Sequence, residues 1–117
     1  MQNWPQIDWD DDGYPTEESL NSLTGVPLDF KSAAQFVRIE LARCAEHCCA
    51  SYKEEAAVDD NFDEPIVKAY FSTGGWSGAE ELMGLISSRF DARHFMAQWN
   101  KGGHYIFEFP TTGPLAT

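Results

Sequence analysis

"IVKAYFSTGGWSGAEEL" (residues 66–82) holds in one run the three local signals that decide the fold: a strand, a glycine-rich turn and a helix start. Residues 66–73 are mostly β-branched and aromatic, which is typical of a strand. Within "SGAE", Ser77 and Glu80 stand three residues apart, the spacing of a capping box at a helix N-terminus. The stretch therefore predicts a strand over 66–73 and a helix over about 79–89.

A short helix is expected upstream, where "DGYPTEES" (residues 12–19) combines turn chemistry with a helix start. Thr16 can accept hydrogen bonds from the first helical amides as the N-cap. Gly25 and Pro27 end the helix, because glycine suits a helix C-terminus and proline does not continue it. The expected range of this helix is about 17–23.

A longer helix is predicted over residues 30–52, with Asp29 as its N-cap. Its apolar residues recur at steps of three and four, the spacing that aligns one helical face. These residues are Phe30, Ala34, Val37, Leu41, Cys44, Cys48 and Tyr52. The acidic stretch 54–64 is expected to be a loop that ends at Pro65.

The last third of the chain predicts a β-hairpin. "RHFMAQW" and "HYIFEF" flank "NKGG", whose asparagine and glycines suit the positive φ angles of a tight turn. The expected strands are 93–99 and 104–109, and alternation gives them one shared apolar face. That face comprises Phe95, Ala97, Trp99, Tyr105, Phe107 and Phe109.

The element order helix, helix, strand, helix, strand, strand predicts an α+β fold: a small three-stranded antiparallel sheet (strands about 66–73, 93–99 and 104–109) with helices covering one face. The length of 117 residues suits a single domain. We expect an acidic, aromatic N-terminal arm over 1–15 whose rings pack on the domain, the domain itself over 16–110, and a flexible tail over 111–117. The chain has neither an apolar run of about 20 residues nor the pattern of a signal peptide, so a cytoplasmic location is expected.

Net charge is the strongest global feature. The chain has 19 Asp and Glu residues against 8 Lys and Arg, a formal charge of −11. Such a surface repels phosphate backbones and anionic lipids, which argues against direct binding of nucleic acid or membrane. The acidic residues concentrate before the first cation, Lys31, and again over 54–64. A protein partner is therefore expected to be basic.

Two tryptophans lie within the first acidic stretch. A tryptophan flanked by carboxylates suits a binding hot spot, because the ring supplies buried area and the acids steer a basic partner. The alternative is an arm packed on its own domain. The candidate partner-binding residues are Trp4, Asp8, Trp9, Asp10, Asp11, Asp12, Glu17, Glu54, Glu55, Asp59, Asp60, Asp63 and Glu64.

The glycine-rich loop suggests an alternative, ligand-binding site. Amides at a helix N-terminus bind anions, and the candidate residues are Gly74, Gly75, Trp76, Ser77 and His104. However, the loop lacks the lysine of a nucleotide-binding loop, and Glu80 and Glu81 would repel a phosphate. A structural turn is favoured, because Ser77 and Glu80 can satisfy the same amides.

The cysteines raise the question of a metal. Cys44 and Cys48 are one helical turn apart and can meet one zinc ion, with His47 nearby and Cys49 adjacent. Structural zinc sites, however, normally pair two separated ligand couples. Reduced cysteines in a helix core are favoured, and neither a metal nor a cofactor is predicted.

The remaining histidines, His94 and His104, belong to the hairpin, and imidazole is a side chain that commonly serves as a general acid or base. If both lie opposite its aromatic face, a small catalytic site is conceivable there, with partners from Glu108, Tyr70 or Ser72. Because no activated nucleophile stands at a recognisable spacing from a base, the chain is not predicted to be an enzyme.

Three motifs together resemble a known group. "DGYPTEESL", "STGGWSGAEEL" and "GGHYIFEF" are similar, in order and spacing, to small proteins encoded in phages and prophages. The resemblance covers residues 12–20 and most of 66–109. It carries over no activity and no catalytic residue, and the cysteine cluster and second acidic stretch lie outside it. It implies a setting, because small phage accessory proteins often act on host machinery or host defence, anti-CRISPR proteins among them.

The expected function is that of a phage or prophage accessory protein that binds a basic host protein, or a protein–nucleic-acid complex, in the bacterial cytoplasm. Its acidic surface is expected to imitate nucleic acid and inhibit a nucleic-acid-handling defence complex. One alternative is a small nucleotide binder or minor enzyme that uses the loop 73–78 and His104. Another is an oligomeric structural phage protein.

Overall fold

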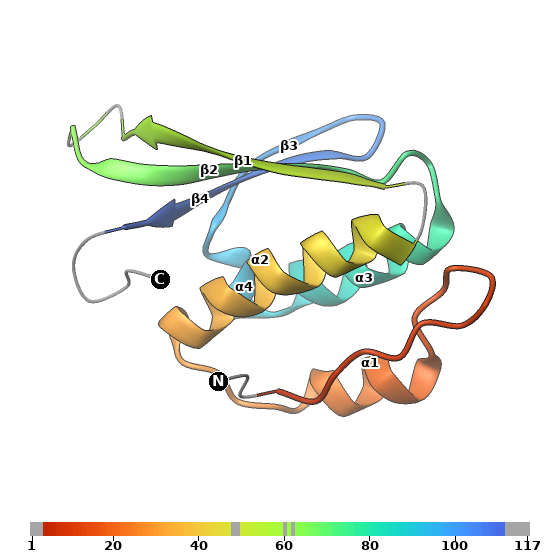
Figure 1. The fold of residues 1–117 in the computed structure, drawn as a ribbon. Coiled ribbons are helices and arrows are strands. Elements are labelled where there is room, and N and C mark those ends of the chain that lie inside the picture. Colours follow the sequence, from red (N-terminus) through yellow and green to blue (C-terminus); the bar gives the residue numbers. More distant parts are fainter. Residues whose placement is uncertain (1–3, 48–49, 60, 62, 112–117) are drawn as a thin grey trace.

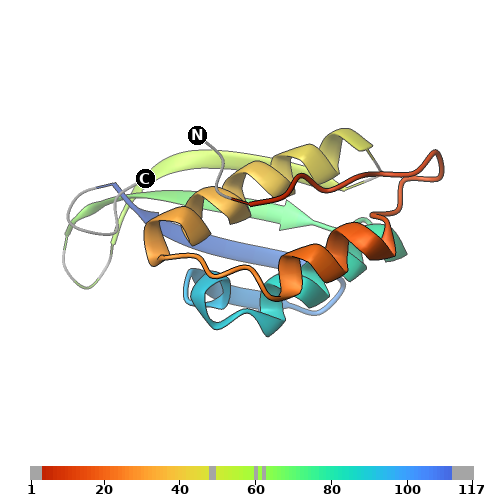
Figure 2. The same cartoon turned by 90° about the horizontal axis from the view of Figure 1, so that it is seen from below.

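The structure is a computed structural model that describes residues 4–47, 50–59, 61 and 63–111. Its elements are α1 (Glu17–Thr24), α2 (Phe30–His47), β1 (Ser51–Val58), β2 (Pro65–Ser72), α3 (Ser77–Ser88), α4 (Phe90–Arg93), β3 (Met96–Asn100) and β4 (His104–Pro110). The strands form one antiparallel sheet in the order β1-β2-β4-β3. Helices α2, α3 and α4 lie on one face of the sheet (Figure 1), and α1 with the N-terminal segment lies outside them, nearest the viewer in Figure 2. The α+β prediction is confirmed, but the sheet has four strands and not three.

The additional strand is β1, which falls where the end of the long helix and an acidic loop were predicted. Helix α2 ends at His47, and Tyr52 lies on β1. Strand β1 pairs with β2 along its whole length, from Ser51↔Ser72 to Val58↔Pro65. Charged side chains are tolerated in β1 because it is an edge strand, exposed to solvent on one side. Sheet pairing therefore overrides a local sequence that lacks the pattern of a strand.

The first two helices begin as predicted. Thr16 caps α1 by accepting a hydrogen bond from the backbone N–H of Ser19 at 3.3 Å. Asp29 Oδ1 accepts from the backbone N–H of Ser32 at 2.7 Å, and this bond lowers the pKa of the Asp29 carboxyl. Both caps satisfy amides that have no partner within the helix.

Helix α3 starts at Ser77, and the predicted capping box is not formed. The N-cap is Trp76, which makes no side-chain capping bond. The Ser77 hydroxyl instead shares a 2.9 Å hydrogen bond with the Tyr14 hydroxyl. The Ser77 hydroxyl, which the local motif predicted to cap the helix, therefore makes a tertiary contact with Tyr14.

The predicted hairpin forms, but its first strand starts late. Residues 90–93, at the predicted strand start, form the short helix α4, and β3 begins at Met96. The pairing of β3 with β4 is irregular between Met96 and Gln98, where a β-bulge shifts the register. A bulge of this kind changes which face the following side chains occupy.

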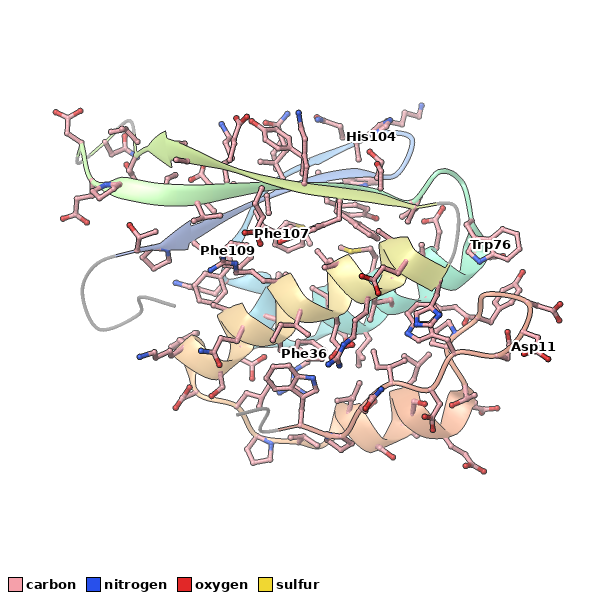
Figure 3. All side chains as sticks on the ribbon, viewed as in Figure 1. Asp11, Phe36, Trp76, His104, Phe107 and Phe109 are labelled. Atoms are coloured by element: carbon pink, nitrogen blue, oxygen red, sulfur yellow. The ribbon has the colours of Figure 1, made fainter. Side chains whose placement is uncertain are left out.

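The predicted apolar face of the hairpin is only partly buried. Phe107 and Phe109 of β4 are fully buried, and Figure 3 shows them between the sheet and the helices. Trp99 pairs directly with Tyr105 and so shares that face as predicted, but its side chain is 64% exposed. Ala97, at the β-bulge between Met96 and Gln98, is also exposed. They lie on β3, the edge strand next to β4, where the helical layer does not enclose them.

The core continues from the sheet through α2 to the N-terminal segment. Trp4 is 5% exposed and packs edge-on against Phe36 of α2, with 5.4 Å between ring centroids. Ile7 is 3% exposed. The rings of the arm therefore pack on the domain, as expected. The other largest fully buried apolar side chains are Phe71, Leu23, Leu41, Leu82, Met83, Ile86 and Val37.

Of the predicted tail, the structure describes only Thr111, whose hydroxyl donates to the carbonyl of Pro65 at 2.8 Å. Residues 112–117 lie outside the described residues. Within the described ranges, none of the helices combines the length and the apolar character that a membrane crossing requires.

Candidate functional site

Three loops from distant parts of the sequence meet at one end of the molecule. They are the arm turn 10–14, the glycine-rich loop 73–76 and the hairpin turn 101–103, and Figure 1 shows them at the right-hand end. Trp76 Nε1 donates to the carbonyl of Gly13 at 2.9 Å. The backbone N–H of Thr73 donates to the carbonyl of Gly103 at 3.0 Å. The three motifs that carry the resemblance to phage proteins therefore form one structural unit, here called the loop end.

The arm turn is held by its own first aspartate. Asp10 Oδ1 accepts hydrogen bonds from the backbone N–H groups of Asp12 and Tyr14, each at 2.9 Å. Gly13 closes the turn with a positive φ of 82°, a conformation that glycine adopts without steric cost. The Asp10 carboxylate is thus used to build the turn. Asp11 and Asp12 are exposed at its tip.

The two ends of the glycine-rich loop are packed closely against neighbouring segments, whereas a Cβ atom added to Gly75, within the loop, would meet no atom within 4 Å. A Cβ atom added to Gly78 would lie 2.5 Å from the carbonyl oxygen of Gly13, and one added to Gly103 would overlap Thr73 Oγ1. The Thr73 side chain is fully buried at this contact. The close packing explains both glycines and favours a structural joint over a ligand-binding loop.

The loop end joins two parts of the sequence that lack cations. No lysine or arginine occurs before Lys31, and none occurs between Lys68 and Arg89. The contacts of Gly13 and Tyr14 with α3 bring these two stretches together. We define the acidic end face as their exposed carboxylates at this end: Asp11, Asp12, Glu17, Glu18, Glu80 and Glu81.

The acidic end face extends to the sheet. Burial and then the nearby charge of Glu80 raise the pKa of Tyr105 on β4 above its usual range. Tyr105 lies opposite Trp99 in the β3–β4 ladder, and Trp99 is exposed. Glu80 of α3 is therefore near Tyr105, the ladder partner of the exposed Trp99. In the sequence, Glu80 belonged to a predicted capping box and Glu80 with Glu81 argued against phosphate, but no local pattern placed them beside the arm.

The candidates in the second acidic stretch divide into two groups. Glu54 accepts from Arg38 Nη2 at 2.7 Å and from the Tyr52 hydroxyl, and the Arg38 bond lowers the pKa of Glu54. Glu55 accepts from the Tyr70 hydroxyl at 2.7 Å. These two carboxylates are engaged within the protein and are poorly placed to steer a partner.

The other candidates of this stretch, Asp59, Asp63 and Glu64, lie in the β1–β2 turn, whereas Asp60 falls outside the described residues. Figure 1 shows this turn at the end opposite the loop end, along a molecule whose longest extent is 43 Å. The two acidic stretches therefore do not form one continuous surface.

The remaining candidates of the arm have structural contacts. Trp4 is buried, so its ring is not presented to a partner. Trp9 is partly buried and stacks on His47, with 5.4 Å between ring centroids and 10° between planes. Asp8 is exposed, and its backbone N–H donates to Ser19 Oγ at 2.9 Å.

The two hairpin histidines do not meet. His104 Nδ1 lies 2.7 Å from Ser72 Oγ, its direct partner in the β2–β4 ladder, on the face of the sheet away from the helices. His94 instead packs on Phe30, with 4.8 Å between ring centroids. The Ser72–His104 contact is the ordinary consequence of cross-strand register, and within the described part of the chain no carboxylate is hydrogen-bonded to the imidazole.

Of the cysteine cluster, the structure describes only Cys44, which is buried on the core side of α2; Cys48 and Cys49 lie outside the described residues. Among the residues that the structure describes, no group of three or more histidine, cysteine or carboxylate side chains could hold a metal ion.

Comparison with known proteins gives no relative. No protein-family model matches the chain, and no curated protein or solved structure matches it. The resemblance to phage and prophage proteins stays a prediction from the three motifs.

Proposed function

We propose that this protein binds a basic protein partner through the acidic end face. The observation that carries the proposal is the joining of two cation-free stretches by the contacts of Gly13 and Tyr14 with α3. Carboxylates from the arm, α1 and α3 then lie at one end, where neither contributing stretch contains a cation and the hairpin turn contributes Lys101. This arrangement exceeds what solubility needs, since soluble surfaces normally mix both signs of charge.

The proposed mechanism is steering followed by occlusion. A concentrated negative field raises the encounter rate with a positively charged surface, and this effect weakens as salt screens the charges. The exposed Trp99, which pairs with Tyr105 in the β3–β4 ladder, offers a ring that a partner can bury. Binding energy would come mostly from such contacts, whereas the carboxylates would set the rate and the choice of partner.

The proposed partner is a nucleic-acid-handling complex of a bacterial host, which this phage or prophage accessory protein would inhibit in the cytoplasm. Such complexes hold nucleic acid in positively charged channels. Carboxylates in place of phosphates can occupy such a channel. The acidic charge supports a cationic target, and the motif resemblance supports the phage setting.

The test compares variants that remove the same charge from opposite ends. Partners are captured from bacterial lysate at low and high salt, identified, and their affinities for the purified protein are measured. The end-face pairs Asp11→Asn/Asp12→Asn and Glu80→Gln/Glu81→Gln should each weaken binding of the same partner several-fold at low salt.

Asp63→Asn/Glu64→Gln is the matched control, because it removes two charges in the β1–β2 turn. Asparagine also tolerates the positive φ of 54° at position 63. Equal weakening by the control and the end-face pairs would show that only net charge matters, and would refute the assigned face.

A further inference from the structure

A groove of about 440 Å³ lies at the end of the molecule opposite the acidic end face. It lies between the β1–β2 turn, the end of β4 and the segment that leads from α4 into β3. Its lining combines carboxylates and the imidazole of His94 with apolar side chains. The residues on which the inference rests are Glu64, Glu108, Ile66, Phe95 and Met96.

The groove follows from the unequal lengths of the hairpin strands. β3 begins at Met96, opposite Phe107, so the last residues of β4 extend beyond it. The backbone N–H of Glu108 donates to the carbonyl of Phe95 at 2.9 Å, which holds the α4–β3 connection against β4. One wall of the groove is therefore formed by strand β4 together with the α4–β3 connection that is hydrogen-bonded to it.

The opposite wall is a tight turn with its own hydrogen bonds. The backbone N–H of Asp59 donates to the carbonyl of Glu64 at 2.8 Å, and that of Asp63 donates to the carbonyl of Asp59 at 2.9 Å. These bonds keep the ends of the turn together. Asp59 Oδ1 accepts a hydrogen bond from the backbone N–H of Asn61 at 2.7 Å, so the inference uses the carboxylates of two other lining residues, Glu64 from the turn and Glu108 from the sheet.

The chemistry of the lining selects a class of ligand. Among the described lining residues none is lysine or arginine, and Lys68, opposite Glu108 in the ladder, forms no ion pair with it. Carboxylates favour a cation, while Ile66, Phe95 and Met96 favour methylene groups. A bare metal ion would gain nothing from the apolar walls. A cationic alkyl chain matches both parts of the lining.

We propose that this groove binds a linear aliphatic polyamine. In the β2–β4 register, Ile66 and its partner Pro110 stand between Glu64 and Glu108, so ammonium groups separated by methylene chains can reach both carboxylates at once. The volume is within the range of small-ligand sites. The proposal does not depend on the proposed function, because the groove and the acidic end face share no residue.

The test is titration calorimetry of the whole protein with spermidine at constant ionic strength. Glu64→Gln/Glu108→Gln should weaken spermidine binding at least about fivefold, because two ammonium–carboxylate contacts are lost. Asp11→Asn/Asp12→Asn removes the same charge at the far end and should change the affinity less than about twofold. Equal losses in both variants would show general attraction to an acidic protein and overturn the proposal.

A second measurement needs no variant and tests the apolar part of the groove. Spermidine should shift the amide resonances of Met96 and Glu108 in the unmodified protein, and 1,5-diaminopentane should bind more tightly than 1,3-diaminopropane. Magnesium ion at the same ionic strength should not displace spermidine. Displacement by magnesium, tighter binding of penta-lysine than of spermidine, or shifts confined to residues 8–18 would each overturn the assignment.

Discussion

Trp4 Nε1 donates a 2.7 Å hydrogen bond to Glu40 Oε2, which ties the N-terminal segment to the middle of α2. Glu40 is fully buried, and Arg43 Nη1 approaches the same oxygen at 3.0 Å. Among the described residues, nothing hydrogen-bonds the second oxygen, Oε1. Burial raises the pKa of the Glu40 carboxyl, with the bonds from Trp4 and Arg43 acting in the opposite direction. A buried carboxyl whose bonds only partly satisfy it is costly, so the arm and α2 depend on each other.

The first prediction concerns the donor. Trp4→Phe keeps a ring in the core but removes the N–H that Glu40 accepts from, so the free energy of unfolding should fall by about 1–3 kcal/mol. Trp99→Phe is the control at an exposed tryptophan and should change it by less than about 0.5 kcal/mol. Denaturant titration measures both. A loss no larger than that of the control would contradict the structural role of the bond.

The second prediction concerns pH. Because the pKa of Glu40 is higher in the folded than in the unfolded protein, the folded state binds more protons between the two values. This group's contribution to stability is therefore greatest at low pH and declines as pH rises above about 4.3, the ordinary glutamate value. Glu40→Gln does not titrate and should gain stability relative to the native protein as pH increases.

The measurement is the difference in unfolding free energy between Glu40→Gln and the native chain, followed from acid to neutral pH. Taking the difference cancels groups whose pKa moves the other way, such as Glu54, whose stabilising contribution is lost as pH falls. A difference that stays constant over this range would mean that burial does not perturb the carboxyl.

The third prediction separates two glycines of α3. Gly78→Ala places a Cβ against the carbonyl oxygen of Gly13 and the Trp76 ring, so it should destabilise the fold by about 1–3 kcal/mol. Gly84→Ala, in the same helix, meets no atom within 4 Å and should stabilise it by about 0.5–1 kcal/mol. Thermal unfolding of the two variants distinguishes them by sign. A stabilising Gly78→Ala would mean that the loop end is not packed as described.

The fourth prediction concerns β1. If residues 51–58 form a strand, the alternate amides that donate to β2 should exchange with solvent much more slowly than those facing outward. Amide hydrogen exchange resolved by residue measures this. The amides of β2, which pairs on both sides, provide the internal reference. Uniformly fast exchange over 51–58 would restore the acidic loop that local sequence suggests.

Local signals predicted the elements that local chemistry controls. Thr16 and Asp29 cap their helices as their positions indicate, and the glycines of the hairpin turn take positive φ at 102 and 103. These features need only a few neighbouring residues, so a single sequence contains them. The apolar spacing predicted a helix that is too long at the end of α2, because the spacing continues to Tyr52, which belongs to β1.

The candidate site was only half predictable. The arm acids Asp11 and Asp12 are evident from composition, but Glu80 lies far away in the sequence. Their association depends on Tyr14 and Trp76, whose hydrogen bonds cross more than sixty residues of chain. Conversely, Trp4 suited a binding hot spot in the sequence and is buried in the structure, because Glu40 and Phe36 receive it.

The sequence by itself determined the α+β class, the caps of α1 and α2, the hairpin turn and an excess of negative charge. The tertiary structure alone decided that 51–58 is a strand, that the arm is tied to α2, and which carboxylates share an end. The physical reason is the separation along the chain over which each interaction acts. Capping and turn preferences act within a few residues, whereas an edge strand, a buried carboxyl and a charged face each depend on partners that only the folded chain brings close.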